Sequence, residues 1–182
     1  MKTPISLAAA VVISAAAVSP GEALAAPWTF AKTSPVTRYD LAPTARGLDA
    51  MPFNVTATGV GSTRVTRMAF MVTGTARTWE VANFQLVYYP DGLSSPGVVV
   101  GSTSGSEWKP GPATSIVSIP LATPVTLQGD FAGAFALRVD VNGAHPFFFQ
   151  PQLQTVTIDD GAEHDLLQTE DLPLPGDTFY VN

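Results

Sequence analysis

The sequence predicts an all-β protein, a single-domain antiparallel β-sandwich of the immunoglobulin-like or jelly-roll kind. Three observations lead to this prediction. Hydrophobic and polar residues alternate at a period of two along most of the chain, turn-forming residues separate the alternating runs, and helical periodicity is nearly absent. The length of 182 residues fits one domain. About eight to ten short strands with frequent turns are typical of this class.

Each alternating run is expected to form one strand. In chain order the runs cover residues 53–57, 68–74, 79–88, 98–100, 116–119, 135–141, 153–158 and 178–181. The run 135–141 is the clearest, because four large hydrophobic residues alternate there with three others. In the run 79–88 the alternation changes phase at Ala82 and Asn83, which predicts a β-bulge.

Turn signals lie between the runs. They are Pro90-Asp91-Gly92, Ser95-Pro96-Gly97, Pro110-Gly111-Pro112, Asn142-Gly143 and Asp159-Asp160-Gly161. Asn142-Gly143 follows the clearest strand and is followed closely by three phenylalanines, so it predicts a hairpin. Two Thr-Ala-Arg triplets, ending at Arg46 and Arg77, are not an internal repeat, because the strand pattern does not follow them.

Composition excludes several classes of protein. The chain has no cysteine, so it is neither a disulfide scaffold, a thiol enzyme nor a holder of a cysteine-ligated metal. The net charge of −6 argues against nucleic-acid binding, which needs clustered lysine and arginine. Because 46% of the residues are hydrophobic and 13% are charged, the chain is expected to fold rather than remain disordered.

The N-terminus is predicted to be a cleaved secretory signal at residues 1–25. Lys2 precedes a short apolar stretch, and Ala23-Leu24-Ala25 fits the small-residue pattern before a cleavage site. No later segment is long and apolar enough to span a membrane. We therefore expect a secreted, extracellular or cell-surface protein, or a periplasmic one if it is retained.

Residues 26–52 are expected to form an irregular arm, because four prolines are spread along them. The arm carries Trp28 and Phe30, and two interpretations stay open. The arm adds a strand to the sheet of a neighbouring molecule, or it closes its own sandwich. The sandwich domain itself is predicted to cover residues 53–182.

The domain ends in an acidic segment, residues 159–177. Seven acidic residues lie in it, and four of them, Asp159, Asp160, Glu163 and Asp165, fall within seven positions around a glycine. Carboxylates grouped in this way suit calcium, although their spacing does not match an EF-hand. Asp140 and Asn142 are a second possible oxygen pair. The alternatives are a solvated loop that keeps the protein soluble, or a contact with a basic partner surface.

Aromatic residues give the best indication of a binding surface. Adjacent residues on a strand point to opposite faces, so one member of Tyr88-Tyr89 and of the phenylalanine run faces outward. The candidates for a ligand platform are Trp79, Tyr89, Trp108 and Phe148. Exposed aromatic rings stack on sugars or mark protein contacts. In the alternative interpretation, loops cover these rings.

Catalytic patterns are weak. The two histidines match no metal or triad motif, and there is no nucleophile elbow. Glu80 and Glu107, each beside a tryptophan, would be the first candidates for a pair of hydrolytic carboxylates. The sequence therefore predicts a protein that is not an enzyme and that requires no cofactor, with calcium as the one candidate ion.

The prediction of function is a structural module of the cell surface that acts in assembly or adhesion. Its partners would be copies of itself, other surface proteins or glycans. The alternative is a carbohydrate-binding module that uses exposed aromatic residues. A glycoside-type hydrolase ranks third.

Overall fold

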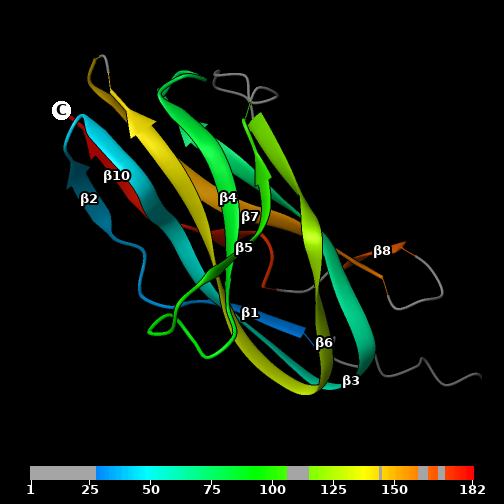
Figure 1. The fold of residues 1–182 in the computed structure, drawn as a ribbon. Coiled ribbons are helices and arrows are strands. Elements are labelled where there is room, and N and C mark those ends of the chain that lie inside the picture. Colours follow the sequence, from blue (N-terminus) through cyan, green and yellow to red (C-terminus); the bar gives the residue numbers. More distant parts are fainter. Residues whose placement is uncertain (1–27, 106–114, 144, 160–163, 168–170) are drawn as a thin grey trace, which may run out of the picture.

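The protein is built almost entirely of strands. The computed structural model describes residues 28–105, 115–143, 145–159, 164–167 and 171–182. In this part of the chain ten strands and no helix occur, so no described helix could cross a membrane. The strands join into one mixed sheet that curls into a half-barrel (Figure 1). The all-β prediction is confirmed.

The strands vary widely in length. They are β1 (Trp28–Lys32), β2 (Arg38–Leu41), β3 (Thr44–Gly74), β4 (Val81–Tyr89), β5 (Val98–Thr103), β6 (Ser115–Asn142), β7 (Phe147–Asp159), β8 (His164–Leu167), β9 (Leu174–Pro175) and β10 (Thr178–Val181).

Two long strands, β3 and β6, form the spine of the sheet. They pair with each other along most of their length, interrupted by register shifts. Gly59 and Gly129 have φ angles of 64° and 65°, and both lie where the ladder is irregular. The sequence predicts separate strands on either side of these positions. Instead each strand bends and continues, because a bulge redirects a strand without ending it.

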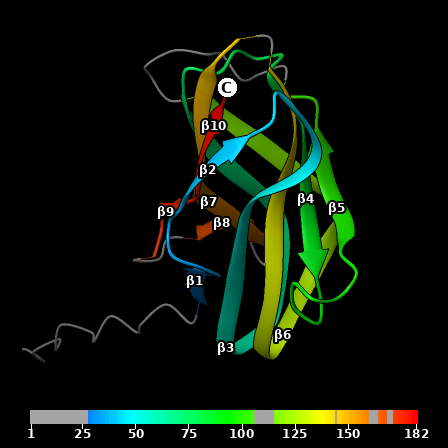
Figure 2. The same ribbon diagram turned by 90° about the vertical axis from the view of Figure 1, so that its left-hand side faces the viewer.

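The order of the sheet is β2-β10-β7-β3-β6-β4-β5 (Figure 2). The pair β10–β2 is parallel and the other pairs are antiparallel, so the antiparallel prediction holds for all but one pair. The structure does not confirm a sandwich of two separate sheets, because β3 and β6 carry the hydrogen bonding around the curve. At the β5 end, Gly101 pairs with Leu121 of β6.

The hairpin predicted at Asn142-Gly143 does not form. These residues connect β6 to β7, but β7 pairs with β3 and β10 and not with β6. The chain therefore crosses over β3 at this point. Phe147 and Phe149 are buried in the core, with Phe149 stacked on Phe179 of β10 at 5.0 Å. These long-range contacts outweigh the local turn signal.

The segment expected to be an irregular arm contains β1, β2 and the start of β3. β1 is antiparallel to β3, with Phe30 opposite Val55. Trp28 and Phe30 are 4% and 2% exposed, so both rings belong to the core of their own chain. The largest fully buried side chains are Phe53, Phe70, Phe84, Phe135, Phe149, Met51, Met68, Leu86, Ile119, Leu127, Leu137 and Leu153.

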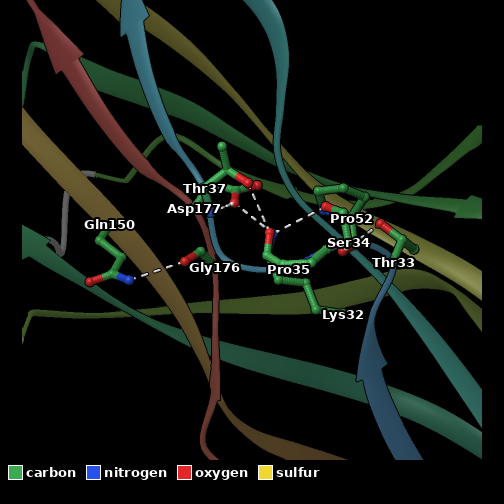
Figure 3. Close-up of polar contacts among 9 residues, drawn as sticks. All are labelled: Lys32, Thr33, Ser34, Pro35, Thr37, Pro52, Gln150, Gly176 and Asp177. Carbon is green, nitrogen blue, oxygen red and sulfur yellow. Dashed lines mark hydrogen bonds and ion pairs between the residues drawn. The ribbon is translucent and has the colours of Figure 1, made fainter.

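A buried ion pair fastens the N-terminal strands to the C-terminal ones. Lys32 Nζ lies 2.6 Å from Asp177 Oδ1, and the two side chains are 7% and 5% exposed (Figure 3). The same carboxylate oxygen accepts a hydrogen bond from the Thr37 amide at 2.7 Å. Lys32 also donates to the Pro35 carbonyl. The turn between β1 and β2 is thereby fixed to the turn before β10.

Candidate functional site

Two adjoining hollows form a polar groove where β4 meets β3, β5 and β6. The first, of about 220 Å³, is lined by Thr44, Arg46, Trp79, Ala82, Asn83, Asp140, Val141 and Asn142. The second, of about 400 Å³, is lined by Asn83, Gln85, Ser102, Thr103, Ser104 and Asp140. Asn83 and Asp140 line both hollows, so the two adjoin at this pair of residues. We call them together the Trp79 groove.

The groove is centred on a bulge in β4. The register between β4 and β6 shifts between Ala82 and Gln85, as the change of phase in the sequence predicts. Asn83 has a φ of 53°, the one positive φ found on a non-glycine residue in the described part of the chain. Asparagine tolerates this left-handed region better than most residues. The bulge directs the Asn83 side chain toward β6.

Asp140 of β6 is held in place from two sides. Its Oδ2 accepts a hydrogen bond from Asn83 Nδ2 at 2.8 Å, and its Oδ1 accepts one from the Gly47 amide at 2.9 Å. These two bonds, together with the positive charge of Arg46, hold the pKa of Asp140 below its ordinary value of 3.8. The groove therefore contains an ionised carboxylate in a fixed orientation.

Trp79 supplies the aromatic wall of the groove. It is 57% exposed, the largest exposed fraction among the large hydrophobic residues of the described chain. The guanidinium of Arg77 lies 5.4 Å from the centre of the Trp79 ring. An exposed indole beside fixed polar groups is suited to stacking against a ring that carries hydroxyl groups.

The turn that carries Trp79 is held by buried polar contacts. Glu80 is 0% exposed, and its Oε2 accepts a hydrogen bond from the Arg77 amide at 2.8 Å. Its Oε1 lies 2.7 Å from His145 Nδ1. The Glu80 carbonyl also accepts a hydrogen bond from the Asn142 amide. Trp79 is thus anchored to the β6–β7 connection.

This finding changes the interpretation of Glu80, one of the two glutamates considered for hydrolysis. Its side chain is buried and points to His145 rather than into the groove. Glu107 lies outside the described residues. The carboxylate that lines the groove is Asp140.

The four aromatic residues expected to form a platform are not brought together among the described residues. Tyr89 faces outward as expected but is only 5% exposed, in a small cluster with Val87. The turn before β5 covers it, since a Cβ on Gly97 would lie 2.6 Å from the Tyr89 ring. Phe148 is half-buried and stacks on Tyr180 at 5.7 Å. Trp108 lies outside the described residues.

Tyr89 has a structural role. Its hydroxyl donates to Asp49 Oδ2 at 2.8 Å and accepts from Arg138 at 3.0 Å, while Arg138 also binds Asp49. Burial, followed by the contact with Asp49, raises the pKa of Tyr89 above its ordinary value. Tyr89 therefore links β3, β4 and β6 and is not available for stacking on a ligand.

The structure describes the backbone of two of the four proposed calcium ligands. Asp160 and Glu163 lie outside the described residues, and Asp159 and Asp165 belong to the paired strands β7 and β8. Among the described residues, no three His, Cys, Asp or Glu side chains group as a metal site. Calcium binding stays a prediction. Asp171, in the same acidic segment, accepts a hydrogen bond from the Phe30 amide at 3.1 Å.

The sequence contained some signals of this groove. The change of phase at Asn83 and the oxygen pair of Asp140 and Asn142 both mark residues that line it. The two arginines beside Trp79, Arg46 and Arg77, come from the two Thr-Ala-Arg triplets. Along the chain, β3 lies between the two triplets, so their common position beside Trp79 depends on the path of β3 and not on a local pattern.

Comparison with known proteins adds little. No family model and no curated protein matches the chain. A family 123 glycoside hydrolase from Clostridium perfringens, described in a structural study of glycolipid glycan hydrolysis, is 6% identical with a TM-score of 0.41, over 86% of this chain and 27% of that one. The collagen-binding subdomain of the Enterococcus faecalis surface protein ACE is 7% identical with a TM-score of 0.26, over 86% and 96%. The chain thus spans about a quarter of the hydrolase, and neither similarity assigns it a function.

Proposed function

We propose that this protein is a secreted or cell-surface adhesion module that binds carbohydrate through the Trp79 groove and catalyses no reaction. The observation that carries the proposal is an exposed tryptophan fixed beside an oriented carboxylate and amide. A sugar ring would stack on Trp79, and its hydroxyls would donate to Asp140 and bond to Asn83. The predicted leader at residues 1–25 supports export.

Stacking and hydrogen bonding together give such a site its selectivity. A sugar has one apolar ring face, which an indole covers, and a rim of hydroxyls, which need polar partners. Asp140 keeps its orientation through Asn83 and Gly47, so the site loses little conformational entropy when a ligand binds. Gln85, Ser102 and Thr103 extend the polar lining past Asp140, which allows more than one sugar unit.

The fold also agrees with a surface module. We propose that the curled sheet is a modified β-sandwich in which β3 and β6 pass from one layer to the other. This accounts for β1 pairing with the first half of β3 and β7 with the second half.

The test is a glycan-binding panel with the exported protein and a Trp79→Ala variant. We expect the wild type to bind at least one glycan and the variant to lose about tenfold or more in affinity, equivalent to about 1.4 kcal/mol. Because Trp79 is 57% exposed, its removal should leave the thermal midpoint nearly unchanged.

The matched control is Tyr39→Ala. Tyr39 is also exposed, at 43%, and lies on β2, which contributes no residue to the lining of the groove. It should bind the same glycans as the wild type. A panel without binding, or equal losses in both variants, would contradict the proposal.

Self-association is a second candidate function, favoured by the β5 edge. Val98 and Val99 are 56% and 47% exposed, and the six residues of β5 include no charge and no proline. Charged residues and proline are what usually protect an edge strand from pairing with another chain. Because β5 already pairs with β6 at Gly101, a second copy of this chain would extend the sheet along Val98 and Val99.

A further inference from the structure

Two arginines flank Trp79. Arg46 lines the groove from β3, and the Arg77 guanidinium lies over the indole ring. Both side chains are exposed, and among the described residues neither forms an ion pair with a carboxylate. Arg138, by contrast, binds Asp49 through two hydrogen bonds.

The carboxylates near these arginines, those of Asp140 and Glu80, accept hydrogen bonds from other groups of the protein. Both oxygens of Asp140 accept hydrogen bonds from the protein, and its Oδ2 is held by Asn83. Glu80 is buried, and its Oε2 accepts a hydrogen bond from the Arg77 amide. Among the described residues, the surface around Trp79 therefore carries two guanidinium groups against one ionised carboxylate, Asp140, whose pKa its hydrogen bonds and the charge of Arg46 lower. The net charge of the whole protein is −6.

A guanidinium group binds carboxylate and sulfate through paired hydrogen bonds, and exposed arginines with no acidic partner are available for such a ligand. We infer that the Trp79 groove selects an acidic polysaccharide, in which the sugar ring stacks on Trp79 while its anionic group binds Arg46 and Arg77. This inference rests on the proposed function and specifies the class of sugar.

Electrostatic attraction between the net charges of the protein and the polysaccharide does not account for such binding. The protein and the polysaccharide both carry net negative charge at neutral pH, so their long-range interaction is repulsive. Binding must then come from a local positive surface. Its strength should fall as salt is added, because these arginines are exposed to solvent.

The test measures the affinity of the exported protein for four polysaccharides by calorimetry. Hyaluronan and polygalacturonate carry carboxylates, dextran sulfate carries sulfates, and dextran is neutral. We expect at least one anionic polysaccharide to bind about tenfold or more tightly than dextran. The carboxylate and sulfate arms identify which anion the arginines accept.

Substitutions distinguish the contribution of the arginine charges to binding from that of stacking on Trp79. Arg46→Gln and Arg77→Gln should each lower the affinity for the anionic polysaccharide about tenfold and reduce its salt dependence. Arg64→Gln, which removes an exposed arginine from the second half of β3, is the matched control and should change neither. Trp79→Ala should lower the affinity for every polysaccharide that binds.

The two proposals fail in different ways. Equal binding of dextran and the anionic polysaccharides, dependent on Trp79 but not on the arginines, would overturn the inference and leave the carbohydrate site intact. Binding that Arg64→Gln weakens as much as Arg46→Gln would also overturn it. Absence of binding to any glycan would overturn both.

Discussion

At the scale of single residues, one irregular position organises the groove. Asn83 adopts a φ of 53° because β4 bulges there, and this conformation brings its amide to Asp140. A strained or uncommon backbone angle persists only where the surrounding structure holds it. Here the hydrogen bond to Asp140 is what holds it. The bulge and the carboxylate therefore depend on each other.

The pKa of Asp140 leads to a prediction about acid stability. Its folded-state pKa is depressed, so its contribution to stability is present above the ordinary value of 3.8 and is lost as the pH falls through the lower folded-state value. Asp140→Asn should lower the free energy of unfolding by about 0.5–1 kcal/mol at pH 7, since an amide replaces one charged acceptor.

The measurement is denaturant unfolding of both proteins from pH 7 to pH 2. The difference between them should stay constant down to about pH 4 and shrink below it. Asp91→Asn is the control, since Asp91 is exposed and makes no hydrogen bond among the described residues. A difference that is constant over the whole range would show that the charge of Asp140 contributes nothing.

At the scale of elements, the ion pair of Lys32 and Asp177 connects the two ends of the chain. Both side chains are almost fully buried, so removing one leaves the other charged and without a partner. Lys32→Met should lower the free energy of unfolding by about 3–5 kcal/mol, the usual cost of breaking a buried pair. Asp177, in the acidic segment 159–177, thus has a structural role.

A double variant tests this explanation. Lys32→Met with Asp177→Asn removes both charges, so it should be less destabilised than the sum of the two single variants. Denaturant unfolding of the four proteins gives the coupling energy. If the losses in free energy of unfolding of the two single variants simply add up to that of the double variant, the interaction between Lys32 and Asp177 contributes nothing to stability.

Some features of these elements can be predicted from the local sequence, and others cannot. The β4 bulge was predictable, because a change of phase at Ala82 and Asn83 is a local signal. The continuity of β3 and the parallel pair of β2 with β10 were not, because both depend on contacts far apart in the chain. The hairpin predicted at Asn142-Gly143 was wrong for the same reason, because β7 pairs with the distant strands β3 and β10. Of the groove, the sequence pointed to Trp79 and Asp140 but not to their proximity.

At the scale of the whole molecule, net charge and the β5 edge have opposite expected effects on the association of two copies of the protein. The charge of −6 keeps copies of the protein apart at low salt. In the proposed self-association, the exposed and uncharged residues Val98 and Val99 would form the contact between copies. Added salt screens the repulsion and leaves the apolar contact, so association should increase with ionic strength.

We predict that the protein has a solution mass above that of one chain, measured by light scattering, and that Val99→Lys returns it to the monomer. A lysine on an edge strand blocks pairing because its charge would be desolvated between two chains. Val36→Lys is the matched control, since Val36 is also about half exposed, at 52%, and lies just before β2. The measurement is made with calcium and with chelator. If the mass falls when calcium is removed, the acidic segment contributes to the contact, whereas a monomer under every condition excludes self-association and leaves the Trp79 groove as the functional surface.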